Sequence, residues 1–207
     1  MKTLDSEEVT AMFCTRRAFL ICVFTIAIAI LLTSANAQDV KRGGLKMDFP
    51  ELEGFVCSEP KHFPNPKHGY LVSYTAQQGP WIRVNVYVYN SGLDRIPDGA
   101  SSEVVKEEIY LIEVGLKELK RQGAYNSYIE LEGGVVQIGD SRVAPKAQRR
   151  LFEIDRTDVG RILTDVYITG YKDHFIKIRI SYPVEEQIEV EKTVAPVLKA
   201  VGEMLGS

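Results

Sequence analysis

The segment Trp81–Asn90, WIRVNVYVYN, places the strongest constraint on how this chain can fold. Its alternate positions carry the aliphatic side chains Ile82, Val84, Val86 and Val88. Aromatic and polar side chains stand between them, and a period of two residues is typical of a β-strand whose two faces have different surroundings. The aliphatic face must pack against a helix or a second sheet, whereas the other face is either half-buried under another layer or open to a ligand.

The first 37 residues have the composition of a secretory signal peptide. Arg16 and Arg17 precede an uninterrupted apolar run over residues 18–32, and small residues follow it. Ala35 and Ala37 occupy the two positions that a signal peptidase reads, so cleavage is expected after Ala37. The polar residues 38–44 are expected to form a flexible tether to a single domain over residues 45–207.

Three alternatives stay open for this leader. Translation could begin at Met1 or at Met12, because the first eleven residues are acidic for the start of a signal peptide. The residues around Arg16 resemble a twin-arginine export motif, although the strongly apolar core favours the general secretory route. Residues 18–35 are also just long enough to act as an uncleaved membrane anchor. Because the leader ends in Ala-x-Ala, cleavage is favoured, and the expected location is periplasmic or secreted.

The charge of the chain limits its expected partners. The formal net charge is -3 at pH 7, and the leader carries equal numbers of acidic and basic residues, so the mature chain keeps this charge. A mildly acidic protein gives no reason to expect binding to nucleic acid or to an anionic membrane. The expected partner is another envelope protein, with membrane contact only through an uncleaved leader.

Cysteine usage indicates how the mature chain is stabilised. Two of the three cysteines lie in the leader, so Cys57 is the only cysteine of the mature chain. It has no partner for an internal disulfide, and the domain must be stabilised by an ordinary hydrophobic core. A buried, inert thiol is favoured over a reactive one.

Hydrophobic patterns predict an α+β fold with an antiparallel sheet of about six strands flanked by helices. A hairpin is predicted from Tyr70–Thr75 and Trp81–Asn90, and a short strand or edge from the alternation of Leu45, Met47 and Phe49. Three prolines make the intervening residues 50–69 a long irregular loop. Further strands are predicted over residues 127–132, 135–138, 147–154, 161–170 and 175–182, with the first two either separate or one bent strand. Tight turns between neighbouring strands imply antiparallel pairing.

Two helices complete the predicted domain. The first begins at an N-cap serine, Ser101 or Ser102, and Gly123 ends it. The second covers residues 184–205, with Ile188 on its apolar face, and either kinks at Pro196 or restarts with Thr193 as its cap. In element order, size and exported context, residues 45–205 resemble the PsbP-like fold of extrinsic photosystem proteins and of small bacterial envelope proteins such as the DcrB family. This resemblance implies an antiparallel sheet flanked by helices and an accessory or assembly role, and it carries over no functional residue.

The polar and aromatic positions of three predicted strands form the first candidate site. If the apolar sides of these strands face one layer, their other sides form one joint surface. Tyrosine rings offer contact area with a polar tip, and arginine suits carboxylates or phosphates, so this surface is suited to bind a peptide or a small ligand. The alternative is that a helix covers the surface and that Asp165 pairs with Lys177 or Arg179 across adjacent strands. The surface comprises Arg83, Tyr87, Tyr89, Asp165, Tyr167, Lys177 and Arg179.

A weaker candidate is a metal site in the proline-rich loop. Cys57, His62 and His68 lie within twelve residues there, and thiolate and imidazole are ligands that zinc and copper prefer. Their spacing matches no compact ligand pair, however, and a fourth ligand is not evident. Two solvated histidines in a surface loop explain the same residues, so neither a metal nor another cofactor is expected.

The loop over residues 91–99 is a third candidate, because its glycines precede a predicted helix start. It lacks the glycine spacing of a phosphate loop or a dinucleotide fingerprint, and turn chemistry explains each of its residues.

The recognised motifs of hydrolases and metalloproteases are also absent, which favours a noncatalytic protein over an enzyme. The leading hypothesis is an exported accessory or assembly factor of the bacterial cell envelope or periplasm that binds another protein. The alternative is a periplasmic protein that binds a small ligand or a metal.

Overall fold

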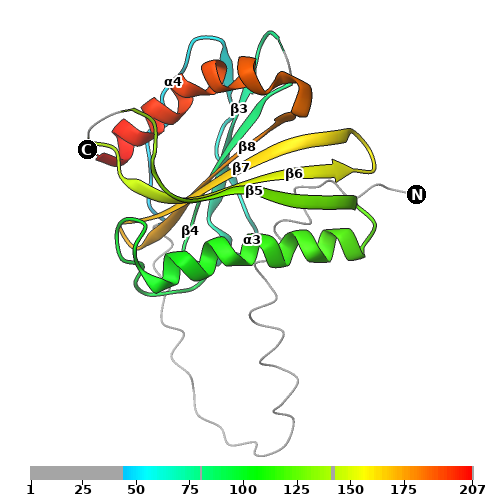
Figure 1. Ribbon diagram of the computed structural model, residues 1–207. Helices are drawn as coiled ribbons and strands as arrows, with labels where there is room; N and C mark the ends of the chain where they lie inside the picture. Colours follow the sequence, from blue (N-terminus) through cyan, green and yellow to red (C-terminus); the bar gives the residue numbers. More distant parts are fainter. Residues whose placement is uncertain (1–43, 80, 141–142, 207) are drawn as a thin grey trace, which may run out of the picture. The chain divides into compact units, whose positions relative to one another are not determined.

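A computed structural model describes residues 44–79, 81–140 and 143–206, and in this part of the chain eight β-strands form one antiparallel sheet (Figure 1). The strand order is β1-β3-β4-β8-β7-β6-β5, and β2 also pairs with β3. The predicted leader, with Ala35 and Ala37, lies outside the described residues. The strands are β1 (Phe55–Cys57), β2 (Lys61–His62), β3 (Tyr70–Ala76), β4 (Arg83–Tyr89), β5 (Tyr125–Gln137), β6 (Lys146–Arg156), β7 (Gly160–Tyr171) and β8 (His174–Pro183).

The predicted α+β class and antiparallel sheet are confirmed, and the sheet is larger than predicted. The two additional strands, β1 and β2, lie in the segment that was expected to be an irregular loop. Both pair with β3, at opposite ends of that strand. Strands of two or three residues fit between the prolines of this segment because an edge strand tolerates proline.

Strand β4 lies inside the sheet, between β3 and β8, as its two-faced pattern requires. Val84 and Val86 are fully buried, and they belong to the main hydrophobic core. The predicted hairpin is confirmed, because Val86 lies directly opposite Val72 of β3. Burial of such aliphatic side chains stabilises the fold by about 2 kcal/mol each.

Two helices cover opposite faces of this sheet: α3 (Glu103–Arg121) and α4 (Gln187–Gly206) (Figure 1). The helix α3 packs on β5, β6 and β7. Its N-cap is Ser102, whose hydroxyl oxygen accepts a hydrogen bond from the Val105 amide at 3.3 Å. Gly123, with a φ of 78°, follows its C-terminus and allows the chain to turn away, as predicted.

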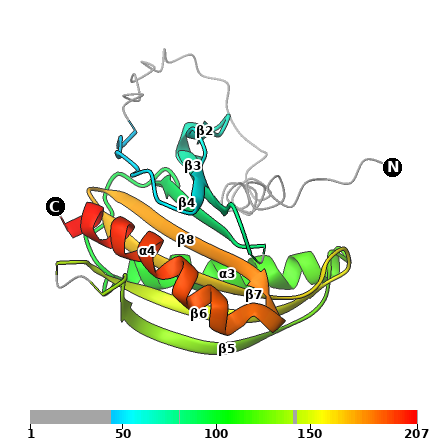
Figure 2. The same ribbon diagram turned by 90° about the horizontal axis from the view of Figure 1, so that it is seen from above.

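The helix α4 runs along β8 with α3 on the far side of the sheet (Figure 2). It follows a short 3-10 helix, η2 (Val184–Glu186), and continues through Pro196 instead of restarting at Thr193. The predicted use of Ile188 was wrong, because this side chain is 79% exposed. No helix in the described part of the chain is long and apolar enough to span a membrane. The face of α4 that packs on the core comprises Val190, Val194, Val197, Val201 and Leu205.

Residues 45–52 form an extended segment, here called the strap, and not the predicted first strand. Leu45, Met47 and Phe49 pack against the main core, but the segment joins no β-ladder of the described residues. Two tyrosine hydroxyls of β3 hold it instead. The Tyr70 hydroxyl donates to the Leu45 carbonyl oxygen at 2.9 Å, and the Tyr74 hydroxyl donates to the Pro50 carbonyl oxygen at 3.0 Å.

Strand β5 is one long bent strand, which decides between the two predicted alternatives. Its pairing with β6 shifts register between Tyr125 and Ser127 and again between Glu130 and Glu132. Such bulges and the following glycine pair bend a strand. Because β5 is the last strand of the sheet, its outer edge is unpaired in the described residues.

Candidate functional site

The register of the sheet divides the predicted polar-aromatic surface between two faces. Asp165 lies opposite Ile180, and Tyr167 opposite Ile178, so both belong to the face that packs toward α4. The five remaining residues of the surface lie on the other face. The expectation of one joint surface was wrong because β7 lies between two layers and is apolar on both sides: Val166 lies opposite Arg179, on the face toward α3.

Asp165 pairs with neither Lys177 nor Arg179, and its partner is Arg149 of β6. The Arg149 guanidinium donates to both oxygens of the Asp165 carboxylate at 2.9–3.0 Å and to Glu132 of β5 at 2.8 Å. The Tyr167 hydroxyl donates to the same carboxylate at 2.8 Å. Burial raises the pKa of Asp165, while the hydrogen bonds from Arg149 and Tyr167 act in the opposite direction. This network joins three neighbouring strands, and a structural role accounts for it.

The residues on the face toward α3 come together as predicted and form what we call the basic tyrosine face. Strands β4 and β8 place Asn85 opposite Arg179, and Tyr87 opposite Lys177. The Lys177 Nζ atom lies 4.5 Å from the centroid of the Tyr87 ring and 5.3 Å from that of Tyr89. This is the geometry of a cation–π contact with two rings at once. The face comprises Arg83, Asn85, Tyr87, Tyr89, Lys177 and Arg179.

Hydrogen bonds orient the tyrosines of the basic tyrosine face. The Ser73 hydroxyl donates to Asn85 Oδ1 at 2.8 Å, and Asn85 Nδ2 donates to the Tyr87 hydroxyl at 3.4 Å. The Tyr89 hydroxyl donates to Oε1 of Glu108 at 2.9 Å. Glu108 belongs to α3 and is only 6% exposed, so the helix contributes directly to this side of the sheet. The sequence interpretation missed Asn85 and Glu108, because their polar character also suits exposed strand and helix positions.

Two cations of this face have no carboxylate partner among the described residues. Neither Lys177 nor Arg179 has a carboxylate within 4.0 Å in this part of the chain, although both are only half-exposed. The Arg179 Nε atom is buried and has no hydrogen-bond partner among the residues that the structure describes. An unsatisfied buried donor is costly, and a half-buried cation is normally paired. By contrast, a carboxylate pairs with each of Arg121, Arg149, Arg150, Arg156 and Arg161.

The three residues of the weak metal candidate make separate contacts. Cys57 lies in β1, where burial raises the pKa of its thiol. The His62 ring packs 5.4 Å from the Tyr70 ring, and His68, in the 3-10 helix η1 (Pro66–His68), packs 6.5 Å from Phe63. Among the described residues, no three histidine, cysteine or carboxylate side chains lie together as a metal site would require.

The loop over residues 91–99 is held against the turn between β7 and β8. Gly99 forms a β-bridge with Gly170, and the Asp98 carboxylate accepts a hydrogen bond from the Lys172 amide at 2.7 Å. The Ile96 amide donates to the Asp173 carboxylate at 3.3 Å. These contacts use the polar groups of the loop within the fold, in agreement with a structural turn.

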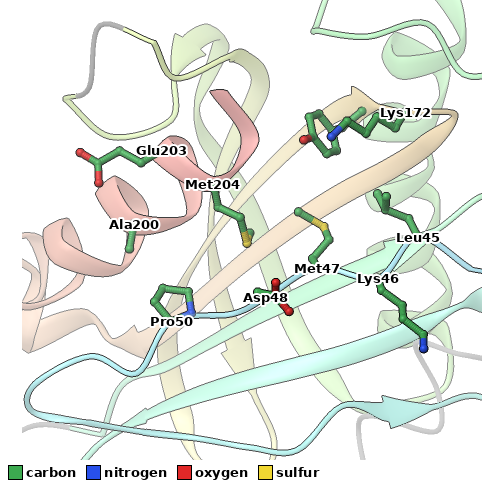
Figure 3. Close-up of a pocket in the computed structure, with 10 residues that line it drawn as sticks. Leu45, Lys46, Met47, Asp48, Pro50, Lys172, Ala200, Glu203 and Met204 are labelled. Atoms are coloured by element: carbon green, nitrogen blue, oxygen red, sulfur yellow. The ribbon is translucent and has the colours of Figure 1, made fainter. Parts of the chain in front are cut away.

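A pocket of about 540 Å³ lies between the strap, the turn from β7 to β8 and the C-terminal part of α4 (Figure 3). Four charged side chains line it, Lys46, Asp48, Lys172 and Glu203. Sequence reasoning missed it because its walls come from three segments far apart in the chain. Its apolar lining comprises Leu45, Met47, Pro50, Tyr171, Ala200 and Met204.

Comparison of the chain with models of protein families, with curated proteins and with solved structures gave no match. The PsbP-like resemblance stays a prediction, and function is inferred below from the geometry of the site.

Proposed function

We propose that this protein is a noncatalytic accessory factor of the cell envelope or periplasm, and that its basic tyrosine face binds an acidic segment of another protein. The observation that carries the proposal is the pair of neighbouring cations on β8. Lys177 and Arg179 point to the same face of the sheet, and neither has a carboxylate within 4.0 Å among the described residues.

An acidic segment would meet two requirements of this face. A carboxylate offsets the cost of keeping two half-buried cations close together. The planar guanidinium of Arg179 suits a carboxylate in particular, because it can donate two parallel hydrogen bonds. Tyr87 and Tyr89 are buried, and their rings hold the Lys177 ammonium group in position for such a carboxylate.

The ionisable groups of the face support binding in preference to catalysis. General acid–base catalysis requires an acid and a base within reach of one reacting group. The described ionisable groups here are cations, tyrosines and Glu108, and the Glu108 carboxylate already accepts the hydroxyl hydrogen of Tyr89. The predicted signal peptide and the accessory role implied by the PsbP-like resemblance support the same proposal.

Affinity capture from the host tests this proposal. A tagged full-length protein should capture a partner in low salt and release it in high salt, because screening weakens ion pairs. The double substitution Lys177→Gln and Arg179→Gln should reduce capture at least about tenfold, the equivalent of one charged hydrogen bond.

The matched control changes the same number of charges elsewhere. Arg161→Gln with Lys192→Gln removes two exposed cations that lie outside the basic tyrosine face, and it should leave capture unchanged. If the Lys177 and Arg179 variant is folded and still captures the partner as well as this control does, the basic tyrosine face is not the binding site.

A further inference from the structure

The pocket beside the strap is lined by both polar and apolar groups, and two methionines belong to its apolar part. Figure 3 shows the side chains of Met47 and Met204 directed toward one another, whereas Lys46 and Glu203 extend away from the space between them. Both methionines also pack against the main core. Methionine is flexible and polarisable, so a wall built from it can adapt to an apolar ligand. A volume of about 540 Å³ lies within the range of small-molecule sites.

One cation lies over an aromatic ring at this pocket, and its backbone is held by a hydrogen bond. The Lys172 Nζ atom lies 4.6 Å from the centroid of the Tyr171 ring, and both residues line the pocket. The Lys172 amide donates a hydrogen bond to the Asp98 carboxylate, which fixes the backbone of this turn. Lys172 itself has a φ of 47°. No carboxylate of the described chain lies within ion-pair distance of this ammonium group.

The strap forms one wall of the pocket and is attached weakly enough to move. It joins no β-ladder in the part of the chain that the structure describes. Its first residue is held by the Tyr70 hydroxyl and by a hydrogen bond of 3.4 Å from the Leu45 amide to His174 Nε2. A segment held by a few side-chain hydrogen bonds opens at lower free energy than a paired strand. A ligand can enter by displacing the strap without breaking the sheet.

We propose that this pocket binds an amphiphile with one apolar chain and a carboxylate head group. The chain lies between Met47 and Met204, and the carboxylate pairs with the ammonium group of Lys172. Burial of the chain supplies most of the affinity, and the charge of Lys172 selects an anionic head group over a cationic one. This site is separate from the basic tyrosine face and does not depend on the function proposed for it.

Isothermal titration calorimetry on the purified full-length protein tests the proposal. The two probes, sodium dodecanoate and dodecyltrimethylammonium, have apolar chains of nearly equal length and are used below their micelle-forming concentrations. Dodecanoate should bind at one saturable site, and more tightly than the cationic probe. Lys172→Gln should weaken dodecanoate binding by about tenfold, the equivalent of one charge-assisted hydrogen bond. Lys192→Gln, at an exposed position of α4 outside the pocket, should not weaken it.

A second variant tests where dodecanoate binds without changing the charge of the pocket. Ala200→Phe places a ring in the pocket from the α4 side and should abolish dodecanoate binding. The proposal is overturned if the wild-type protein shows no saturable binding, if Lys172→Gln and Lys192→Gln bind equally well, or if a folded Ala200→Phe protein binds as wild type does. Should Ala200→Phe fail to fold, the comparison of Lys172→Gln with Lys192→Gln decides.

Discussion

Lys177 lies directly opposite Tyr87 in the pairing of β8 with β4, and its Nζ atom lies 4.5 Å from the centroid of the Tyr87 ring. A cation–π contact at a half-exposed site contributes about 1 kcal/mol, which is less than a desolvated cation gains from a carboxylate. The contact therefore orients the ammonium group without neutralising it. Lys177 is available to an acidic partner, in contrast to the cations that already have a carboxylate within the chain.

Lys177→Met should change the free energy of unfolding by less than about 1 kcal/mol. The lost cation–π contact is offset by relief of repulsion from Arg179, the neighbouring cation on the same face. Urea denaturation of the purified variant measures this value. A loss of several kcal/mol would instead assign Lys177 a structural role and weaken the proposed binding function.

Arg149→Met should destabilise the protein by about 3 kcal/mol, because it leaves a buried carboxylate without its cation. Asp165 is only 6% exposed, and the Tyr167 hydroxyl would be its remaining side-chain donor. Arg161→Met is the control: it breaks an ion pair in which the arginine side chain is 57% exposed, and it should leave the urea midpoint unchanged. Equal midpoints for the two variants would contradict the structural role of the Arg149 network.

Gly170→Ala should destabilise the contact between the loop over residues 91–99 and β7. A Cβ atom at this position would lie 2.0 Å from the Pro97 carbonyl oxygen, so the backbone of the loop would have to move. Overpacking of this kind costs about 1–3 kcal/mol. Thermal unfolding and hydrogen exchange of the Ile96 and Gly99 amides measure the effect, and unchanged protection of those amides would show that the loop is not held as described.

Alkaline pH should destabilise the protein in part through Tyr182. Burial, followed by the nearby Asp165 charge, raises the pKa of this tyrosine to about 12. The ordinary value in an unfolded chain is about 10. The folded state therefore holds the proton more tightly, and the stability that this group contributes is complete below pH about 10 and is lost as the pH rises toward 12.

Urea unfolding between pH 8 and 12, together with absorbance at 295 nm, follows this titration. Tyr182→Phe should flatten the alkaline decrease in stability, whereas Tyr110→Phe, at a side chain that is 51% exposed, should not. An identical pH dependence in both variants would contradict the assignment to Tyr182.

The local pattern of each strand and helix could be predicted from the sequence, and the face to which a strand turns its polar side could not. The alternation in β4 and the first and last residues of α3 follow from chemistry within one segment. The orientation of Asp165 depends on the register between β7 and β8, and one residue of register exchanges the two faces of a strand. Lys177, Arg179 and the tyrosines of β4 were grouped correctly because they lie on the central strand and its neighbour.

The pocket beside the strap could not be predicted for a similar reason. Its residues come from segments centred near residues 47, 171 and 203, and only the packed fold brings them together. The alternation of Leu45, Met47 and Phe49 was interpreted as a strand, whereas it marks the side on which the strap packs against the core. The strap does not pair as a strand. Its apolar side chains need only an apolar surface to be buried, whereas a strand also needs the free edge of a sheet to pair with.

Zero-length cross-linking in cells of the native host is the most direct test of the proposed function. A carbodiimide joins a lysine amine to a carboxylate only where the two groups are in contact. The account predicts a cross-linked peptide that joins Lys177 to an aspartate or glutamate of another protein and that is lost in the Arg179→Gln variant. If Lys177 remains unlinked, or is linked only to carboxylates of its own chain while exposed lysines such as Lys192 react, the basic tyrosine face does not bind an acidic partner.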